Sequence, residues 1–236
     1  MVTFEEAAAV RPAEPHRAAA SRRTAAKYAV ELIGTFFLVF TVGTAVRSVG
    51  SFAPLAIGAV LMVMIYAGGH ISGGHYNPAV TLAVLLRHRI ALRDAVRYWI
   101  AQLVAGLLAA VVARAVVDPA QPAAPPHPAL TFHTIAAAFV VELLFTFALC
   151  YVMLNVATSR SHPDNSFYGL AIGFTVVAGG FAVGAISGGV FNPAVTIGAA
   201  VMGMFAWPTL WVYLAAQLIA GAAAGAVFLA LDPDDR

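Results

Sequence analysis

The sequence predicts an all-α membrane protein in which six transmembrane helices and two re-entrant half-helices form an inverted repeat of three plus three helices. The first observation is composition: 61% of the 236 residues are hydrophobic and only 10% are charged, against roughly 25% charged residues in a soluble domain. The second is a set of long apolar runs, reflected in a mean hydropathy of +0.85. The third is a motif that returns after 115 residues.

Composition also excludes several other classes of protein. The net charge is only +2, which argues against a nucleic-acid partner. The chain has a single cysteine, Cys150, so a disulfide scaffold is excluded and this residue is expected in the core. We therefore expect the lipid bilayer to be the surroundings of most of the chain.

The transmembrane helices follow from the apolar runs. A helix needs about 20 mostly apolar residues to cross the hydrocarbon core of a bilayer. Six stretches are long enough or nearly so: 28–47, 54–70, 95–117, 133–156, 168–184 and 207–231. Strands are excluded because these runs lack the alternation of a membrane β-barrel.

More polar segments divide the chain into parts. Residues 1–26 are rich in Ala and Arg and lack the apolar core of a signal peptide, so we expect a mobile cytoplasmic tail there. The connection 118–132 contains five prolines, which disfavour a helix. The expected parts are the tail, a first repeat half at 27–117, the extracellular connection 118–132, a second repeat half at 133–231 and a cytoplasmic C-terminus at 232–236.

Orientation follows from the positions of the basic residues, because Lys and Arg accumulate on the cytoplasmic side. With a cytoplasmic N-terminus, 11 basic residues lie inside and 2 lie outside. The inside set is Arg11, Arg17, Arg22, Arg23, Lys27, Arg87, Arg89, Arg93, Arg97, Arg160 and Arg236, and the outside set is Arg47 and Arg114. We expect a multi-pass protein of the cell membrane (plasma or inner membrane) with both termini cytoplasmic. The run 87–97 has an alternative interpretation as a site for anionic lipids.

The repeat is the most informative feature of the sequence. Residues 71–81 read Ile-Ser-Gly-Gly-His-Tyr-Asn-Pro-Ala-Val-Thr, and residues 186–196 read Ile-Ser-Gly-Gly-Val-Phe-Asn-Pro-Ala-Val-Thr. Each half holds three membrane helices, and because three is an odd number the second half is inverted relative to the first. Inverted repeats of this kind place a solute site near the bilayer midplane, between the halves.

Each half also contains a short apolar segment that cannot span a membrane. Segments 77–86 and 192–202 each follow a Gly-rich loop. Irregular backbone at membrane depth is tolerated only where protein buries it or a watery cavity solvates it. We therefore expect two half-helices that enter from opposite faces and meet in the middle.

The Asn-Pro pairs at 77–78 and 192–193 predict the starts of these half-helices. Asn is a favoured N-cap, and Pro is favoured at the first helical position. The Asn carbonyl can cap the helix while its amide group donates elsewhere. Each start also carries about half a positive charge from the helix dipole. The meeting point should therefore donate hydrogen bonds, repel cations and interrupt a file of water molecules as a path for protons.

With these motifs the sequence resembles the aquaporin family, the major intrinsic proteins, over residues 28–231. The resemblance rests on both Asn-Pro-Ala boxes, on Glu31 and Glu142, and on the Gly-His-Ile-Ser-Gly-Gly-His run at 69–75. It implies six tilted helices and two half-helices around a pore in each subunit of a homotetramer. It also implies passive conduction of water and small neutral solutes, with no enzymatic activity, cofactor or metal site.

The resemblance assigns roles to particular residues. The pore motifs are Asn77, Pro78, Ala79, Asn192, Pro193 and Ala194. The backbone carbonyls along the pore belong to Gly73, Gly74, His75, Tyr76, Gly188, Gly189, Val190 and Phe191. Counting from the two boxes, the selectivity ring consists of Ile57, Gly180, Gly189 and Val195.

This ring departs from the pattern of the family. An arginine usually follows the second Asn-Pro-Ala box, and here that position is Val195. The ring has no charge and no aromatic side chain, so we expect a pore wider and more apolar at this point than in water-selective relatives, with glycerol-like solutes admitted. A neighbour such as Phe181 could instead lean into the space left by the glycines.

Two interpretations of Glu31 and Glu142 remain open. Ionisable groups inside membrane spans call for a functional or structural explanation. As a proton relay they would serve a proton-coupled secondary transporter of a small solute. As structural groups they would accept hydrogen bonds from the backbone N–H groups of the re-entrant loops, which is also their role in the family. The sequence therefore favours a passive channel, with the transporter as the alternative.

Overall fold

The computed structural model describes residues 15–117 and 132–235, and within these ranges it contains helices and no strand. The described elements, in chain order, are α1 (Pro15–Ser48), η1 (Gly50–Phe52), α2 (Ala53–Ser72), α3 (Pro78–Leu86), α4 (Leu92–Val116), α5 (Phe132–Thr158), α6 (Tyr168–Ser187), α7 (Pro193–Val201), η2 (Trp207–Thr209) and α8 (Leu210–Leu231). Six of the described helical segments are long and apolar enough to cross a membrane. The predicted fold class is confirmed.

The first helix begins earlier than expected. We expected a tail up to residue 26, but α1 starts at Pro15. The segment 15–26 is rich in Ala and Arg, which are good helix formers, and proline is favoured in the first turn of a helix. The rest of the expected tail (1–14), most of the proline-rich connection (118–131) and residue 236 lie outside the described residues.

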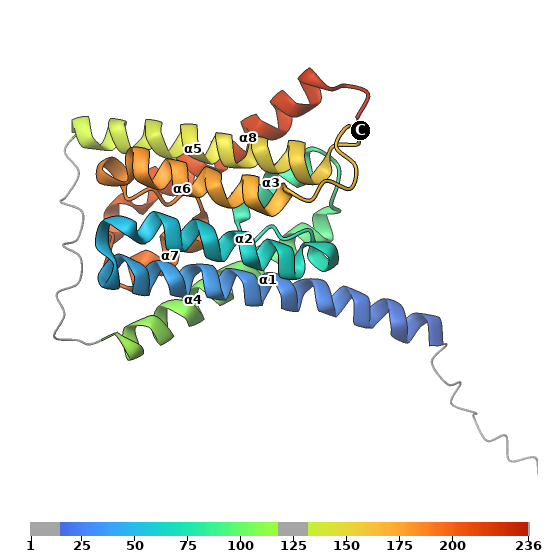
Figure 1. The fold of residues 1–236 in the computed structure, drawn as a ribbon, viewed down its shortest axis with the longest axis horizontal. Coiled ribbons are helices and arrows are strands. Elements are labelled where there is room, and N and C mark those ends of the chain that lie inside the picture. The colour runs from blue at the N-terminus through green and yellow to red at the C-terminus, as the bar shows by residue number, and fades with distance from the viewer. Residues whose placement is uncertain (1–14, 118–131, 236) are drawn as a thin grey trace, which may run out of the picture.

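The two halves are interlocked through their half-helices. Helix α1 packs against α2 and α4, and α5 packs against α6 and α8, while α3 lies on α8 and α7 lies on α4. Each half-helix therefore rests on the last helix of the other half. Glycines permit this approach: a side chain at Gly106 of α4 would meet the carbonyl of Ala194, and one at Gly221 of α8 would meet that of Ala79. Figure 1 shows α3 and α7 inside the bundle of longer helices.

The two ends of the bundle differ in the number of basic residues that they carry. The start of α1 and the chain segment that follows α8 lie at the same end of the bundle, on the right of Figure 1. We call this end the basic face, because eight of the ten described Lys and Arg side chains lie there: Arg22, Arg23, Lys27, Arg87, Arg89, Arg93, Arg97 and Arg160. The opposite face carries η1 and the last turns of α1, α4 and α7. Two arginines there donate to the last carbonyls of the α7 region: Arg47 to Met202 and Arg114 to Val201.

Candidate functional site: a pore between two half-helix starts

The two half-helices begin at the predicted Asn-Pro pairs. Asn77 is the N-cap of α3, and its Oδ1 accepts a hydrogen bond from the backbone N–H of Ala79 at 2.9 Å. Asn192 caps α7 in the same way, with its Oδ1 accepting from Ala194 at 2.9 Å. Each cap satisfies a backbone donor that the first turn of a helix leaves unpaired. Both Asn side chains line the same cavity.

The amide nitrogens of the two asparagines join the halves to each other. Nδ2 of Asn77 donates to the carbonyl of Phe191 at 2.8 Å, and Nδ2 of Asn192 donates to that of Tyr76 at 2.9 Å. Tyr76 and Phe191 adopt left-handed backbone conformations, with φ of 48° and 52°. Each amide group has a second N–H, for which no hydrogen-bond partner is found among the described residues.

The first buried carboxylate holds the loop before α3. Oε1 of Glu31 accepts from the hydroxyl of Ser72 at 2.7 Å and from the N–H of His75 at 2.9 Å. Its Oε2 accepts from the N–H of Tyr76 at 2.7 Å and from Nε2 of Gln102 at 2.8 Å. Glu31 is fully buried. The carboxylate thus supplies acceptors for backbone donors that would otherwise be unpaired at membrane depth.

The second carboxylate repeats this arrangement. Oε1 of Glu142 accepts from the hydroxyl of Ser187 at 2.7 Å and from the N–H of Val190 at 3.0 Å. Its Oε2 accepts from the N–H of Phe191 and from Nε2 of Gln217, both at 2.9 Å. The two glutamines complete the pattern. The sequence contained a sign of these two glutamines, because the tripeptide Ala-Gln-Leu occurs at 101–103 and again at 216–218, at the offset of the repeat.

A cavity of about 390 Å³ brings the predicted ring residues together. All four members of the ring line it: Ile57, Gly180, Gly189 and Val195. The cavity runs from the two asparagines to Gly50 and Ser51, which are exposed at the opposite face. Among the described residues, no Asp, Glu, Lys or Arg lines it. A solute between the asparagines and the opposite face therefore meets mostly hydrocarbon and backbone.

The ring glycines leave less room than their missing side chains suggest. A Cβ on Gly180 would lie 2.7 Å from Cβ of Pro54, so this glycine lets α6 approach α2. A Cβ on Gly189 would lie 3.2 Å from Cα of Gly180, and the φ of Gly189 is +64°. Phe181 also lines the cavity, although 55% of the residue is exposed. The open wall of the ring is therefore formed mainly by the side chains of Ile57 and Val195.

The residues expected to offer backbone carbonyls divide into two groups. Five of them line the cavity of about 390 Å³: Gly74, His75, Gly188, Gly189 and Val190. Gly73 lines a second cavity of about 320 Å³ at the basic face. Tyr76 and Phe191 line neither cavity, because their carbonyls accept the Asn amides and their N–H groups bind the carboxylates. This pair connects the two halves.

The second cavity has a different lining. Lys27, Arg89 and Asp94 contribute charges to it, and Ser72 and Thr158 contribute further polar groups. His75 lines both cavities, and its Nδ1 lies 3.1 Å from the hydroxyl oxygen of Thr81. We call this space the basic vestibule.

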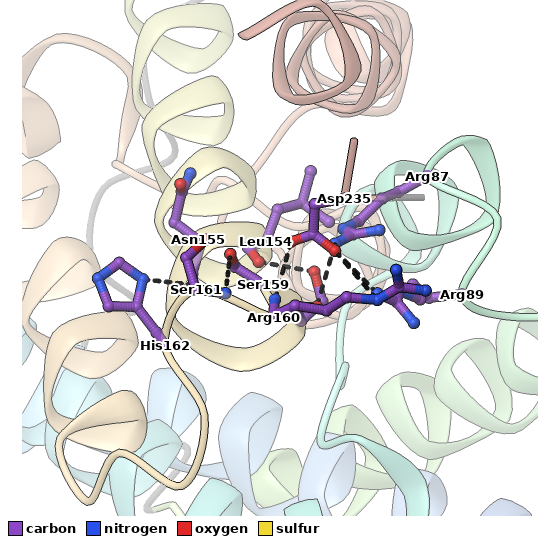
Figure 2. A network of polar contacts seen from close by, with 10 residues as sticks. Arg87, Arg89, Leu154, Asn155, Ser159, Arg160, Ser161, His162 and Asp235 are labelled. Atoms are coloured by element: carbon purple, nitrogen blue, oxygen red, sulfur yellow. Dashed lines mark hydrogen bonds and ion pairs between the residues drawn. The ribbon is translucent and has the colours of Figure 1, made fainter. Parts of the chain in front are cut away.

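A cluster around Asp235 lies beside the basic vestibule (Figure 2). Oδ1 of Asp235 lies 2.8 Å from Nη2 of Arg87, 2.9 Å from Nη2 of Arg89 and 3.7 Å from Nε of Arg160. Its Oδ2 accepts from the backbone N–H of Arg160 at 2.8 Å. Burial raises the pKa of Asp235, but the N–H of Arg160 and the guanidinium of Arg87 outweigh it and hold the pKa well below its usual range.

Arg87 is the most deeply buried member of this cluster. It is fully buried, its guanidinium stacks over the ring of Phe228 at 4.2 Å, and it donates to the carbonyl of Thr158 at 3.1 Å. This burial removes Arg87 from the set of residues that could bind an anionic lipid, the alternative interpretation of the run 87–97. No local pattern in the sequence points to Asp235, because its partners Arg87, Arg89 and Arg160 lie far away along the chain.

A bundle of six membrane helices with two half-helices meeting at paired asparagines defines the class: a polytopic membrane protein with a pore inside each chain. The family model described as "Major intrinsic protein" matches residues 19–229. The chain belongs to the major intrinsic protein family, which is a family of channels.

Similar proteins carry channel or facilitator names. The chain is 41% identical over 197 residues to "Glycerol uptake facilitator protein-like 6" of Lactiplantibacillus plantarum, covering 80% of this chain and 90% of that protein. It is 37% identical over 203 residues to "Aquaporin NIP1-4" of Oryza sativa subsp. japonica, covering 83% and 72%. The aquaglyceroporin from Plasmodium falciparum has the same fold, with a TM-score of 0.73 at 18% identity, covering 87% of this chain and 95% of that one.

Proposed function

We propose that this chain is a passive channel for water and small uncharged solutes, and that solutes of the size of glycerol are among them. The observation that carries the proposal is the meeting of two helix starts at Asn77 and Asn192, which line one cavity. Each start carries about half a positive charge, and each amide has an N–H left for a solute. Such a point binds neutral oxygen atoms and repels cations. The relative named as a glycerol uptake facilitator supports the choice of solute size.

We assign the ring of Ile57, Gly180, Gly189 and Val195 to the wall of this passage. The described residues that line the cavity include no charged side chain, and this supports the assignment because no such side chain would hold an ion there. Cation rejection then depends on the asparagines and the two helix starts, because the arginine usual in the family is replaced by Val195. The carbonyls of Gly74, His75, Gly188 and Val190 supply acceptors along the route.

The alternative, a transporter coupled to protons through Glu31 and Glu142, has less support. Both carboxylates are fully buried, each accepts four hydrogen bonds, and neither is among the residues lining the two cavities. A proton relay needs a path to solvent, so we assign these groups a structural role. We likewise propose that the chain has no enzymatic activity.

The test is stopped-flow light scattering on vesicles containing the purified protein, with gradients of water, glycerol, urea and ammonia. A channel gives fluxes above those of protein-free vesicles, proportional to the solute gradient and unaffected by an imposed proton gradient. Solute accumulation driven by the proton gradient, and its loss in the Glu31→Gln and Glu142→Gln variants, would establish the transporter instead.

We also propose that the basic face is cytoplasmic, with both termini on that side of the cell membrane, and that the protein is a homotetramer. The eight described basic residues at that face, against two at the opposite face, support the orientation. The tetramer rests on the family resemblance. Accessibility of a terminal tag in intact cells tests the first proposal, and the mass of the detergent-solubilised protein tests the second.

A further inference from the structure

The two cavities share a small part of their lining. The cavity of about 390 Å³ and the basic vestibule of about 320 Å³ have two lining residues in common among the described part of the chain, His75 and Met153. Helix α5 gives the order along the pore. Leu149 lines the first cavity, Met153 lines both, and Ala157 lines the vestibule. Residues four apart lie on one face of a helix, so a solute that moves between the cavities passes Met153.

The His75 side of this region is held in place by several contacts. The hydroxyl of Thr81 donates to the carbonyl of Asn77 at 3.1 Å and accepts from Gln102 at 3.0 Å. A hydroxyl has one proton, so its contact with Nδ1 of His75 requires the proton on Nδ1. The ring of Tyr98 packs edge-on at 5.1 Å. These contacts fix the imidazole and leave its Nε2 as a hydrogen-bond acceptor.

The free nitrogen of His75 lies on the vestibule side. A Cβ on Gly73, which lines the vestibule, would lie 3.1 Å from Nε2 of His75. The other shared lining residue, Met153, is 2% exposed and offers a flexible thioether in place of a fixed wall. One part of the shared lining is therefore rigid and polar, and the other is apolar and adaptable.

The inverted repeat provides an internal comparison. At the repeat offset of 115, the counterpart of His75 is Val190, and at the offset of 111 that relates Glu31 to Glu142, the counterpart of Met153 is Val42. Both valines line the large cavity, which continues past them to the opposite face. The pore is thus open where the repeat has two valines and narrows where it has His and Met.

We propose that solutes are selected by size at this neck between His75 and Met153, on the basic side of the asparagines, and not at the ring of Ile57, Gly180, Gly189 and Val195. The proposal rests on the proposed channel function and names the residues that set its size limit. The ring lies inside one continuous cavity, whereas the neck separates two. A fixed imidazole gives the neck a defined edge, and the length of the methionine side chain sets the remaining width.

The experiment changes the width of the neck from the Met153 side. Met153→Ala widens it and Met153→Phe narrows it, while Leu154→Ala is the matched control. Leu154 is the next residue of α5, is fully buried and lines neither cavity. Each variant is reconstituted in vesicles, and the fluxes of water, glycerol and the larger polyol erythritol are measured by stopped flow after a size-exclusion check of folding.

We expect Met153→Ala to raise the ratio of erythritol flux to water flux by about tenfold, and Met153→Phe to lower the ratio of glycerol to water by a similar factor. Leu154→Ala should keep both parent ratios. The phenylalanine variant, which creates no void, keeps the test decisive if truncation lowers the folded yield. If the folded Met153 variants keep the flux ratios of the parent protein, the proposed neck is wrong. It is also wrong if Leu154→Ala changes these flux ratios as much as the Met153 variants do. A parent without neutral flux above protein-free vesicles overturns the channel function itself.

Discussion

Around Glu31 and around Glu142 the two halves repeat the same contacts, whereas the two residues after the Gly-Gly pair differ between the re-entrant loops. In both halves a Ser hydroxyl, two loop N–H groups and a Gln amide bind the carboxylate, at distances between 2.7 and 3.0 Å. The residue after the Gly-Gly pair is His75 in the first half and Val190 in the second. The surroundings of the two threonines then differ as well.

Thr81 contacts His75, and Oε1 of Gln102 has no hydrogen-bond partner among the described residues. In the second half Oε1 of Gln217 lies 3.1 Å from the hydroxyl of Thr196. The comparison shows which contacts the fold requires. Buried loop donors need an acceptor in either orientation, so the carboxylates are repeated. The side chain that faces the pore has no such requirement, so it can differ between the two ends.

Removing either carboxylate should have the largest effect and should affect the two halves equally. Glu31→Ala and Glu142→Ala each leave two buried backbone donors and two side-chain donors without an acceptor, at about 1–3 kcal/mol for each unpaired group. We expect a loss of several kcal/mol, seen as little folded protein in size-exclusion profiles. Glu→Gln keeps one acceptor oxygen and should lose less. A variant that is harmless in one half only would contradict the structural equivalence of the two carboxylates.

Within residues 15–117 and 132–235, no ion-pair cluster like that of Asp235 is found beside α7, so loss of the Asp235 cluster should affect one end of the molecule. Asp235→Asn leaves the buried guanidinium of Arg87 without its anion, which should cost about 3–5 kcal/mol. The exposed neighbour Asp234 supplies the control, because Asp234→Asn should leave the melting temperature unchanged.

The pH dependence of this cluster follows from the sign of the shift. The pKa of Asp235 lies below its usual value, so the stabilisation is complete above the unfolded pKa of about 3.9 and is lost only as pH falls through the lowered pKa. Asp235→Asn should therefore lower the melting temperature by the same amount from about pH 5 to 8. If the difference in melting temperature between the parent and Asp235→Asn becomes smaller between about pH 5 and 8, the ion pairs of Asp235 do not account for it.

Variants of Asn77 and Asn192 test whether the two helix starts act together as a barrier to cations. Asn77→Asp and Asn192→Asp each place a negative charge where two helix starts repel cations, and we expect potassium leak from vesicles to rise by about tenfold in either variant. Asn→Ser at the same positions keeps a neutral cap and serves as the control. If the aspartate variants fold and stay as tight to potassium as the parent, the barrier lies elsewhere.

Val195→Arg tests the half of the pore that lacks a charge. A guanidinium beside Ile57 would narrow the ring and add donors, so glycerol flux should fall about tenfold while water flux falls less. Val195→Leu adds bulk without charge and separates the two causes. Parallel loss of both fluxes would indicate simple blockage.

The smallest effect should come from making the second half resemble the first. Val190→His places an imidazole near Thr196, where the first half holds His75 beside Thr81. The ratio of glycerol flux to water flux should fall by about threefold, with little change in stability. Val190→Leu controls for volume. An unchanged ratio would mean that an imidazole narrows the pore only when it faces a methionine.

Local patterns in the sequence predicted most of the fold, and contacts between distant residues account for what it missed. The Asn-Pro pairs predicted the first residues of α3 and α7, because capping depends on adjacent residues. Helix α1 begins at Pro15, earlier than the apolar run 28–47 indicated, because residues with high helix propensity precede that run. Counting from the two boxes gave four residues that line one cavity, but the packing of Gly180 against Pro54 depends on how α2 and α6 meet. The ion pair of Arg89 with Asp235 joins residues 146 apart, and no local pattern indicates it.

The interlocking of the half-helices imposes an order on synthesis. Helix α7 is made after α4, the helix on which it rests, so its docking surface already exists when it emerges. Helix α3 is made early, yet it packs against α8, and the cluster that neutralises Arg87 needs Asp235. Chains emerge from the N-terminus at about 5–20 residues per second. For the several seconds that translation of the second half takes, α3 has only its contacts within the first half, such as the hydrogen bond from Gln102 to Thr81, and its packing against α8 waits for the last helix to insert.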